Sequence, residues 1–205
     1  MRIIKINPRK LEKQKIKEVI NLLKKDGVII FPTDTVYGLL ADATSQKAIK
    51  KIFKIKKRKT EMAIPIFVKD IKTAKKLAYF TKKKEKIIKK YWPGKATFIL
   101  KRRNILPKAI FGNEKTIGLR IPKYKTVNAL LARLNSPLTG TSANISGYLA
   151  STKIQEVIKQ FQGRKNKPDL VLDAGNLKPS KPSTIIDLTG EKFKILRKGA
   201  VKFKI

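Results

Sequence analysis

The residues best suited to chemistry gather in four short segments of small hydroxyl side chains, glycines and isolated cations. A guanidinium close to an ammonium fits a phosphate chain, and Gly, Ser and Thr let a ligand approach backbone amides closely. The sequence holds neither a Walker loop nor a G-x-G-x-x-G fingerprint. The four segments therefore favour anion binding of another kind, at residues 32–38 (PTDTVYG), 56–59 (KKRK), 139–147 (TGTSANISG), and 182–184 (PST) followed by 197–199 (RKG).

Each segment taken alone also fits a plain structural role. Thr, Asp and Gly suit an ordinary capped turn, so residues 32–38 need not bind anything. Cations at a helix end complement its dipole and usually face solvent, which is the simplest explanation of residues 56–59. Local patterns leave these alternatives open.

Composition excludes several classes of function. The chain of 205 residues has no Cys and no His, which excludes disulfide scaffolds, thiol nucleophiles and Ser-His hydrolysis. No apolar run is long enough for a membrane span and the N-terminus lacks the apolar stretch of a signal peptide, so we expect a cytoplasmic protein without membrane association. The net charge of +36 attracts polyanions, and it has two interpretations: an RNA-binding surface, or the Lys-rich usage of an A+T-rich coding sequence.

The elements that must position the four segments alternate along the chain. Helices are expected at residues 11–25, beginning with Leu11, and at 45–57, 71–78, 82–91, 127–134 and 156–161. Strands are expected at residues 28–31, 63–68, 96–101, 116–120, 138–141, 170–172, 184–188 and 194–196. This order predicts an α/β layered fold around a mixed sheet, in one domain over residues 1–205.

Seven segments together resemble the YrdC/Sua5 family, the L-threonylcarbamoyladenylate synthases that begin the t6A modification of tRNA at position 37. They are PTDTVYGL (32–39), IFKIKKRK (52–59), YWPGKATFIL (91–100), IGLRIP (117–122), TSANISG (141–147), PSTIIDL (182–188) and ILRKGA (195–200). The resemblance implies a YrdC-like twisted mixed sheet flanked by helices, with a basic concave site. It also implies a nucleotidyltransferase that converts L-threonine, bicarbonate or CO2, and ATP with its Mg2+ into threonylcarbamoyl-AMP and pyrophosphate.

The resemblance also implies roles for individual residues. The family's KxR/SxN tetrad around the nucleotide phosphates matches Lys56, Arg58, Ser142 and Asn144. Further ATP contacts match Met62, Thr116, Thr152 and Arg197. The positions that bind threonine match Thr35, Phe67, Arg120, Ser142 and Ser183.

The chain departs from the family pattern at several of these positions. Met62 stands where Asn is common, and Lys59, Ala63 and Lys95 stand where Pro is usual. Phe67 occupies a position that is often a threonine-contacting His. The Mg2+ ligands are left open among Asp34, Asp173 and Asp187.

Two other functions remain as alternatives. The first is a YrdC-like RNA-binding protein without synthase activity, in which the basic face binds tRNA or another structured RNA. The second is the YrdC module of a carbamoyltransferase that acts on another acceptor, as in hydrogenase maturation factors. In the synthase interpretation the chain is of the short, single-domain type and passes its product to a separate tRNA threonylcarbamoyl transferase complex.

Overall fold

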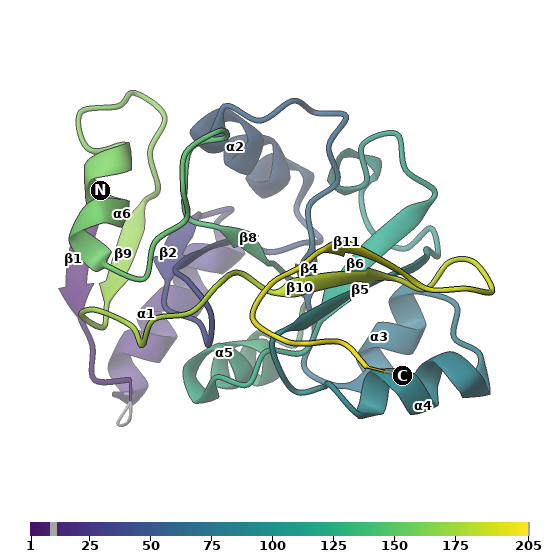
Figure 1. Ribbon diagram of the computed structural model, residues 1–205. Coiled ribbons are helices and arrows are strands. Elements are labelled where there is room, and N and C mark those ends of the chain that lie inside the picture. The colour runs from purple at the N-terminus through teal and green to yellow at the C-terminus, as the bar shows by residue number, and fades with distance from the viewer. Residues whose placement is uncertain (9–11, 205) are drawn as a thin grey trace.

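Eleven strands form two mixed sheets in a computed structural model that describes residues 1–8 and 12–204. In the first sheet, sheet A, the order is β1-β9-β2-β3-β8; in the second, sheet B, it is β11-β10-β5-β6-β4-β7 (Figure 1). The strands of sheet A are β1 (Arg2–Lys5), β2 (Ile29–Phe31), β3 (Gly38–Leu40), β8 (Thr141–Ser142) and β9 (Leu170–Asp173). The strands of sheet B are β4 (Ile66–Phe67), β5 (Ala96–Lys101), β6 (Thr116–Arg120), β7 (Leu138–Thr139), β10 (Thr184–Asp187) and β11 (Lys194–Arg197).

Helices cover three of the four sheet faces. They are α1 (Lys13–Lys24), α2 (Gln46–Lys56), α3 (Ile71–Leu77), α4 (Lys82–Lys89), α5 (Lys125–Leu134) and α6 (Ile154–Phe161), with one 3-10 turn at Lys108–Ile110. Alternate residues of sheet A pack on α1 and α5 on one side and on α2 and α6 on the other, because neighbouring strand residues face opposite ways. On sheet B, α3 and α4 pack against the face that carries Phe98 and Leu100. The other face of sheet B carries Thr97 and Ile99, which leaves it free to line a cavity.

The helix α2 shows how the sequence sets these elements. The Oγ of Ser45 accepts a hydrogen bond from the amide of Ala48 at 3.0 Å and caps the first turn. One stripe of the helix, including Ile49, Ile52 and Phe53, is buried. The helix ends at Lys56, and the next residue, Lys57, has a φ of 50° in the left-handed region. Lys56, in the last turn, is thereby held at the edge of the core.

The expected layered α/β fold is confirmed, with strands divided between two sheets where one was expected. Both β5 and β6 have the bounds that the sequence predicted, and the other expected helices and strands are present with shifted ends. The expected strand at residues 138–141 is two strands in different sheets, since the chain crosses between them at Gly140. Strands β1 and β3 were not predicted, and Leu11 lies outside the described residues. Among residues 1–8 and 12–204, no helix has the length and apolar character needed to cross a bilayer.

Candidate active site

A cavity of about 300 Å3 lies between the two sheets. The loop that follows β2 lines one side, the exposed face of β5 and β6 lines the floor, and residues 140–142 with the start of β10 and the end of β11 complete it. Seven predicted site residues line it, each from a different loop or strand: Thr35, Arg58, Phe67, Arg120, Ser142, Ser183 and Arg197. The fold therefore brings together all four segments singled out by residue type.

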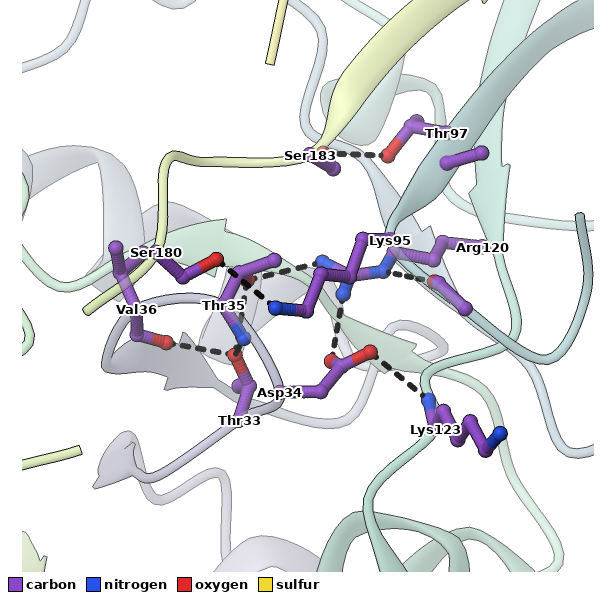
Figure 2. A network of polar contacts seen from close by, with 12 residues as sticks. Thr33, Asp34, Thr35, Val36, Lys95, Thr97, Arg120, Lys123, Ser180 and Ser183 are labelled. Atoms are coloured by element: carbon purple, nitrogen blue, oxygen red, sulfur yellow. Dashed lines mark hydrogen bonds and ion pairs between the residues drawn. The ribbon is translucent and has the colours of Figure 1, made fainter. Parts of the chain in front are cut away.

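Arg120, the last residue of β6, is the most deeply buried cation that lines this cavity, with 3% of its surface exposed. Its Nε donates to the carbonyl of Gly94 at 2.9 Å, Nη1 to Thr35 Oγ1 at 3.2 Å and Nη2 to Asp34 Oδ1 at 2.5 Å (Figure 2). Asp34 also accepts from the backbone amide of Lys123 at 3.1 Å. Burial lowers the pKa of Arg120, and the Asp34 carboxylate partly offsets that effect. The guanidinium is thus held rigidly at the cavity wall, with two of its five N–H groups unused by the described residues.

Ser183 lies on the neighbouring part of the wall, just before β10. Its hydroxyl lies 2.9 Å from Thr97 Oγ1 on β5 (Figure 2). The Arg197 guanidinium donates from Nη2 to the Ser183 carbonyl at 2.7 Å and to its Oγ at 3.3 Å. Burial lowers the pKa of Arg197. A second cation and two hydroxyls are therefore fixed beside each other by the pairing of β5, β10 and β11.

Lys56 is directed into the loop that follows β8 and does not line the cavity. Only 2% of it is exposed, and its Nζ donates to Ser142 O at 2.6 Å, Asn144 O at 2.8 Å and Asn144 Oδ1 at 3.0 Å. The Ser142 hydroxyl also donates to Asn144 Oδ1, at 2.6 Å. Burial and the nearby Arg58 lower the pKa of Lys56 to about 7. The three contacts show that Lys56 holds the loop of Ser142 and Asn144 in place.

Arg58 lines the cavity two residues further on. Its Nη2 donates to the carbonyl of Ala63 at 2.8 Å and its Nε to that of Met62 at 3.4 Å. Burial lowers the pKa of Arg58. The chain that joins α2 to β4 thus orients Arg58 with its own backbone carbonyls.

Besides Lys56, four more predicted ATP-contacting residues lie outside the cavity lining. Met62 is 50% exposed, and Thr152 accepts a backbone hydrogen bond from Leu177 at 2.9 Å. Thr116 begins β6, on the same face as Arg120 but four residues away from it. Asn144 is held by Lys56 and donates from Nδ2 to the Tyr148 carbonyl at 2.6 Å.

Phe67 stands where the family often has His. It is 3% exposed, and its ring centroid lies 5.5 Å from Cζ of Arg120. A Cβ at Gly140 would lie 2.4 Å from this ring, so the close crossing of the chain at Gly140 requires glycine. Phe67 contributes an apolar wall under the guanidinium, and no hydrogen-bonding group.

The candidate Mg2+ ligands do not come together. Asp34 is paired with Arg120, Asp173 accepts from the amide of Gly175 at 2.7 Å, and Asp187 accepts from the amide of Thr189 at 2.7 Å. No group of three His, Cys, Asp or Glu side chains suited to a metal occurs in the part of the chain that the structure describes. The carboxylates of the described residues thus do not fit a protein-held Mg2+ site.

Sequence reasoning included Thr33 only as part of the segment 32–38 and missed Thr97; both also line the cavity. The amide of Thr35 donates to Thr33 Oγ1 at 3.1 Å, and the Thr33 hydroxyl donates to the carbonyl of Val36 at 2.7 Å. The alternation of residues along β5 was the available signal for Thr97. Because Thr97 lies between the apolar residues Ala96 and Phe98, its side chain points to the opposite face of the strand.

Comparisons with known proteins agree with this arrangement. The Sua5/YciO/YrdC family model, described as "Telomere recombination", matches residues 21–199. The chain is 37% identical, over 98% of its length and 94% of the relative's, to a protein of Methanocaldococcus jannaschii named "Putative threonylcarbamoyl-AMP synthase". The crystal structure of Pyrococcus abyssi Sua5 complexed with L-threonine superposes with a TM-score of 0.90 at 30% identity, covering 97% of this chain and 58% of that one.

The crystal structure of Escherichia coli YciO is equally similar in fold. Its TM-score is 0.90 at 26% identity, and the match covers 100% of this chain and 98% of that one. The family model spans most of the 205 residues and includes every segment that lines the cavity. The chain belongs to the Sua5/YciO/YrdC family.

Proposed function

We propose that the protein is an L-threonylcarbamoyladenylate synthase, which joins L-threonine, bicarbonate or CO2, and ATP into threonylcarbamoyl-AMP and pyrophosphate. One observation carries the proposal: the lining of a single cavity contains a buried guanidinium with hydroxyls beside it, two further guanidinium groups and a segment of small residues. A carboxylate and a phosphate chain are the anions that such groups bind. The L-threonine complex of Pyrococcus abyssi Sua5 supports threonine as the amino acid.

Arg120 is the proposed partner of the threonine carboxylate. Its two unused N–H groups are available for a bidentate contact. Thr35 and Ser183 present hydroxyls within the same cavity, suited to the amine and hydroxyl of threonine. Phe67 supplies an apolar wall, and Ser142 also lines the cavity. The Phe67 ring takes no part in proton transfer, so its proposed role is only to position the threonine.

Arg58 and Arg197 are the proposed partners of the ATP phosphates, with the loop of Ser142 and Asn144 supplying small polar groups. Lys56 acts on this loop as a positioning residue, because its ammonium donates its hydrogen bonds to Ser142 and Asn144. Contacts from Met62, Thr116 and Thr152 require a nucleotide that extends beyond the cavity, since none of the three lines it.

The chemistry requires no covalent enzyme nucleophile. The threonine amine adds to CO2 to form a carbamate with loss of a proton, and a carbamate oxygen then attacks the α-phosphorus while pyrophosphate leaves. Charge develops on phosphate oxygens, where fixed guanidinium groups stabilise it. Mg2+ would enter with ATP on its phosphates, and the chain's own residues bind and orient the two substrates.

The assay is direct. The protein is incubated with L-threonine, bicarbonate, ATP and Mg2+, and threonylcarbamoyl-AMP and pyrophosphate are measured. Omission of threonine should abolish pyrophosphate release. Failure to form either product in the complete mixture would overturn the proposal.

Residues 1–205 are proposed to act as one domain in the cytoplasm and to deliver their product to a tRNA threonylcarbamoyl transferase complex. The shared cavity between the two sheets supports one domain, because neither sheet could form the site alone. The transfer to a partner is supported by the synthase activity proposed above, whose product must be consumed by a separate acyl transfer to RNA.

RNA binding without synthase activity is the second candidate, and the net charge of +36 favours it. It predicts RNA affinity that falls steeply with salt and does not depend on threonine or ATP. An RNA-binding protein that forms no threonylcarbamoyl-AMP would establish this candidate over the first.

A further inference from the structure

A second and larger cavity, of about 700 Å3, lies away from the candidate active site. Helix α3 forms one wall, and the chain segments around residues 103–106 and 135–137 form the others. The two cavities have no lining residue in common. Helix α3 packs on one face of sheet B (Figure 1). Thr97 and Arg120 lie on the opposite face, so the sheet separates the two cavities.

The lining of this second cavity is strongly basic. One acidic residue, Asp70, faces five cations: Lys69, Lys72, Lys75, Lys76 and Arg103. Asp70 is already used as the helix cap, because its Oδ1 accepts from the amide of Thr73 at 2.6 Å. The single carboxylate thus cannot neutralise the five cations, and the lining carries a net positive charge.

The cations differ in whether they form ion pairs or hydrogen bonds with other side chains. Lys75 pairs with Glu85 at 2.6 Å, and Lys69 donates to Asn135 Oδ1 at 2.9 Å. Neither Lys72 nor Lys76 forms an ion pair with any described residue, and both are exposed. They lie four residues apart, which places them on one face of α3 about 6 Å apart along its axis. Two cations in a row without a close ion pair to a described residue suit successive charges of a chain better than a single anion.

A planar surface adjoins this row of cations. The Arg103 guanidinium, which lines the cavity, lies over the Tyr79 ring with Cζ 4.2 Å from its centroid. Tyr79 is 53% exposed, and Ile105, also in the lining, is 62% exposed. Guanidinium planes and aromatic or apolar side chains are surfaces on which unpaired bases stack.

We propose that this second cavity, the α3 groove, binds a single-stranded segment of RNA, with Lys72 and Lys76 on its phosphates and Arg103 with Tyr79 beside its bases. The exposed Tyr79 ring and Ile105 side chain offer stacking and apolar contacts to bases, which neither an acidic protein segment nor a free polyphosphate carries. The inference does not depend on the synthase proposal, because no residue of the groove lines the candidate active site.

The test measures the affinity of the full chain for a fluorescent single-stranded RNA of about 15 nucleotides, long enough to fill such a site. Affinity is measured at several salt concentrations between about 50 and 200 mM. Lys72→Gln with Lys76→Gln should weaken binding by about tenfold and reduce the slope of log affinity against log salt by about 1.4, the value for two single-strand phosphate contacts. Tyr79→Ala should weaken binding without changing that slope.

A matched control separates the groove from the general charge. Lys13 and Lys17 are exposed, four residues apart on α1, and form no ion pair with any described residue. Lys13→Gln with Lys17→Gln removes the same charge at the same spacing and should leave the slope within about 0.3 of the unaltered value. Equal losses in the two double variants would overturn the proposal and assign binding to the net charge alone.

Two further measurements complete the test. Inorganic tripolyphosphate at equal phosphate concentration should compete poorly, and competition as strong as that of the RNA would overturn binding of a nucleic-acid chain in favour of a small polyanion. An acidic peptide that displaces the RNA as well as unlabelled RNA does would assign the groove to a protein partner instead. Pyrophosphate release should be unchanged in the Lys72/Lys76 variant, so failure of the groove and failure of the synthase proposal are separately visible.

Discussion

The guanidinium of Arg120 and the carboxylate of Asp34 form a 2.5 Å ion pair in which both side chains are more than nine-tenths buried. The two residues are 86 positions apart, one at the end of β6 and the other in the loop after β2. The pair thus fixes the loop of Thr33 and Thr35 against sheet B. The ion pair also uses one N–H group of the guanidinium that we propose binds the threonine carboxylate. Asp34 therefore sets the orientation of the remaining N–H groups of Arg120.

Removing the carboxylate tests this arrangement. Asp34→Ala leaves a buried guanidinium with no counter-charge, so we expect the free energy of unfolding to fall by about 3–5 kcal/mol, measured by urea denaturation. Lys153→Ala, which breaks the exposed pair with Glu156, is the control and should leave stability nearly unchanged. A stability loss in Asp34→Ala no larger than that of the control would show that Arg120 does not depend on its partner.

The fork of Arg120 is tested by a change that keeps its charge. Arg120→Lys loses the planar, bidentate geometry, so we expect the KM for threonine to rise by more than about tenfold while the KM for ATP changes much less. Pyrophosphate release at varied concentrations of each substrate gives both values. An equal rise in the two KM values would contradict the assignment of Arg120 to threonine.

Arg58 should act on ATP instead. Arg58→Ala removes a guanidinium from the cavity wall, and we expect the rate of pyrophosphate release to fall by more than about tenfold, the equivalent of about 1.4 kcal/mol in the barrier. Lys59→Ala is a matched control, because Lys59 is an exposed cation in the same segment and does not line the cavity. Similar losses in both variants would indicate a general effect of charge near the cavity.

The segments that line the cavity were easier to identify in the sequence than the pairing of the strands. Three of the four segments were recognisable because each places small polar residues directly beside a strand, as at Phe31 and Thr35. The two-residue strands β4, β7 and β8 were poorly defined in the sequence, since such strands are created by their partners. The pairing of β1 with β9 joins residues 168 positions apart, such as Arg2 and Leu170, and no local pattern encodes it.

The orientation of Lys56 could not be predicted either. Its neighbours in the sequence are cations at a helix end, a pattern typical of solvated side chains. Its burial results from the loop after β8, whose carbonyls at Ser142 and Asn144 replace water around the ammonium. The same segment therefore contains one cation that supports the site and one, Arg58, that lines it.

The buried ammonium of Lys56 makes stability depend on pH. Burial and the charge of Arg58 lower its pKa from 10.5 to about 7. Between these values the unfolded chain binds more protons than the folded one, so the free energy of unfolding rises with pH, by at most about 1.4 kcal/mol per pH unit. This stabilisation is complete above about pH 10.5 and is lost as the pH falls to about 7.

Lys56→Met removes the titrating group and keeps a side chain of similar length. We expect the unaltered protein to gain stability relative to Lys56→Met as the pH rises from about 7 to 10, measured by urea denaturation at each pH. Lys54→Met, at an exposed position of the same helix, should follow the unaltered protein throughout. A difference between the unaltered protein and Lys56→Met that stays constant with pH would mean that the three acceptors around Nζ keep the ammonium protonated, in spite of its burial.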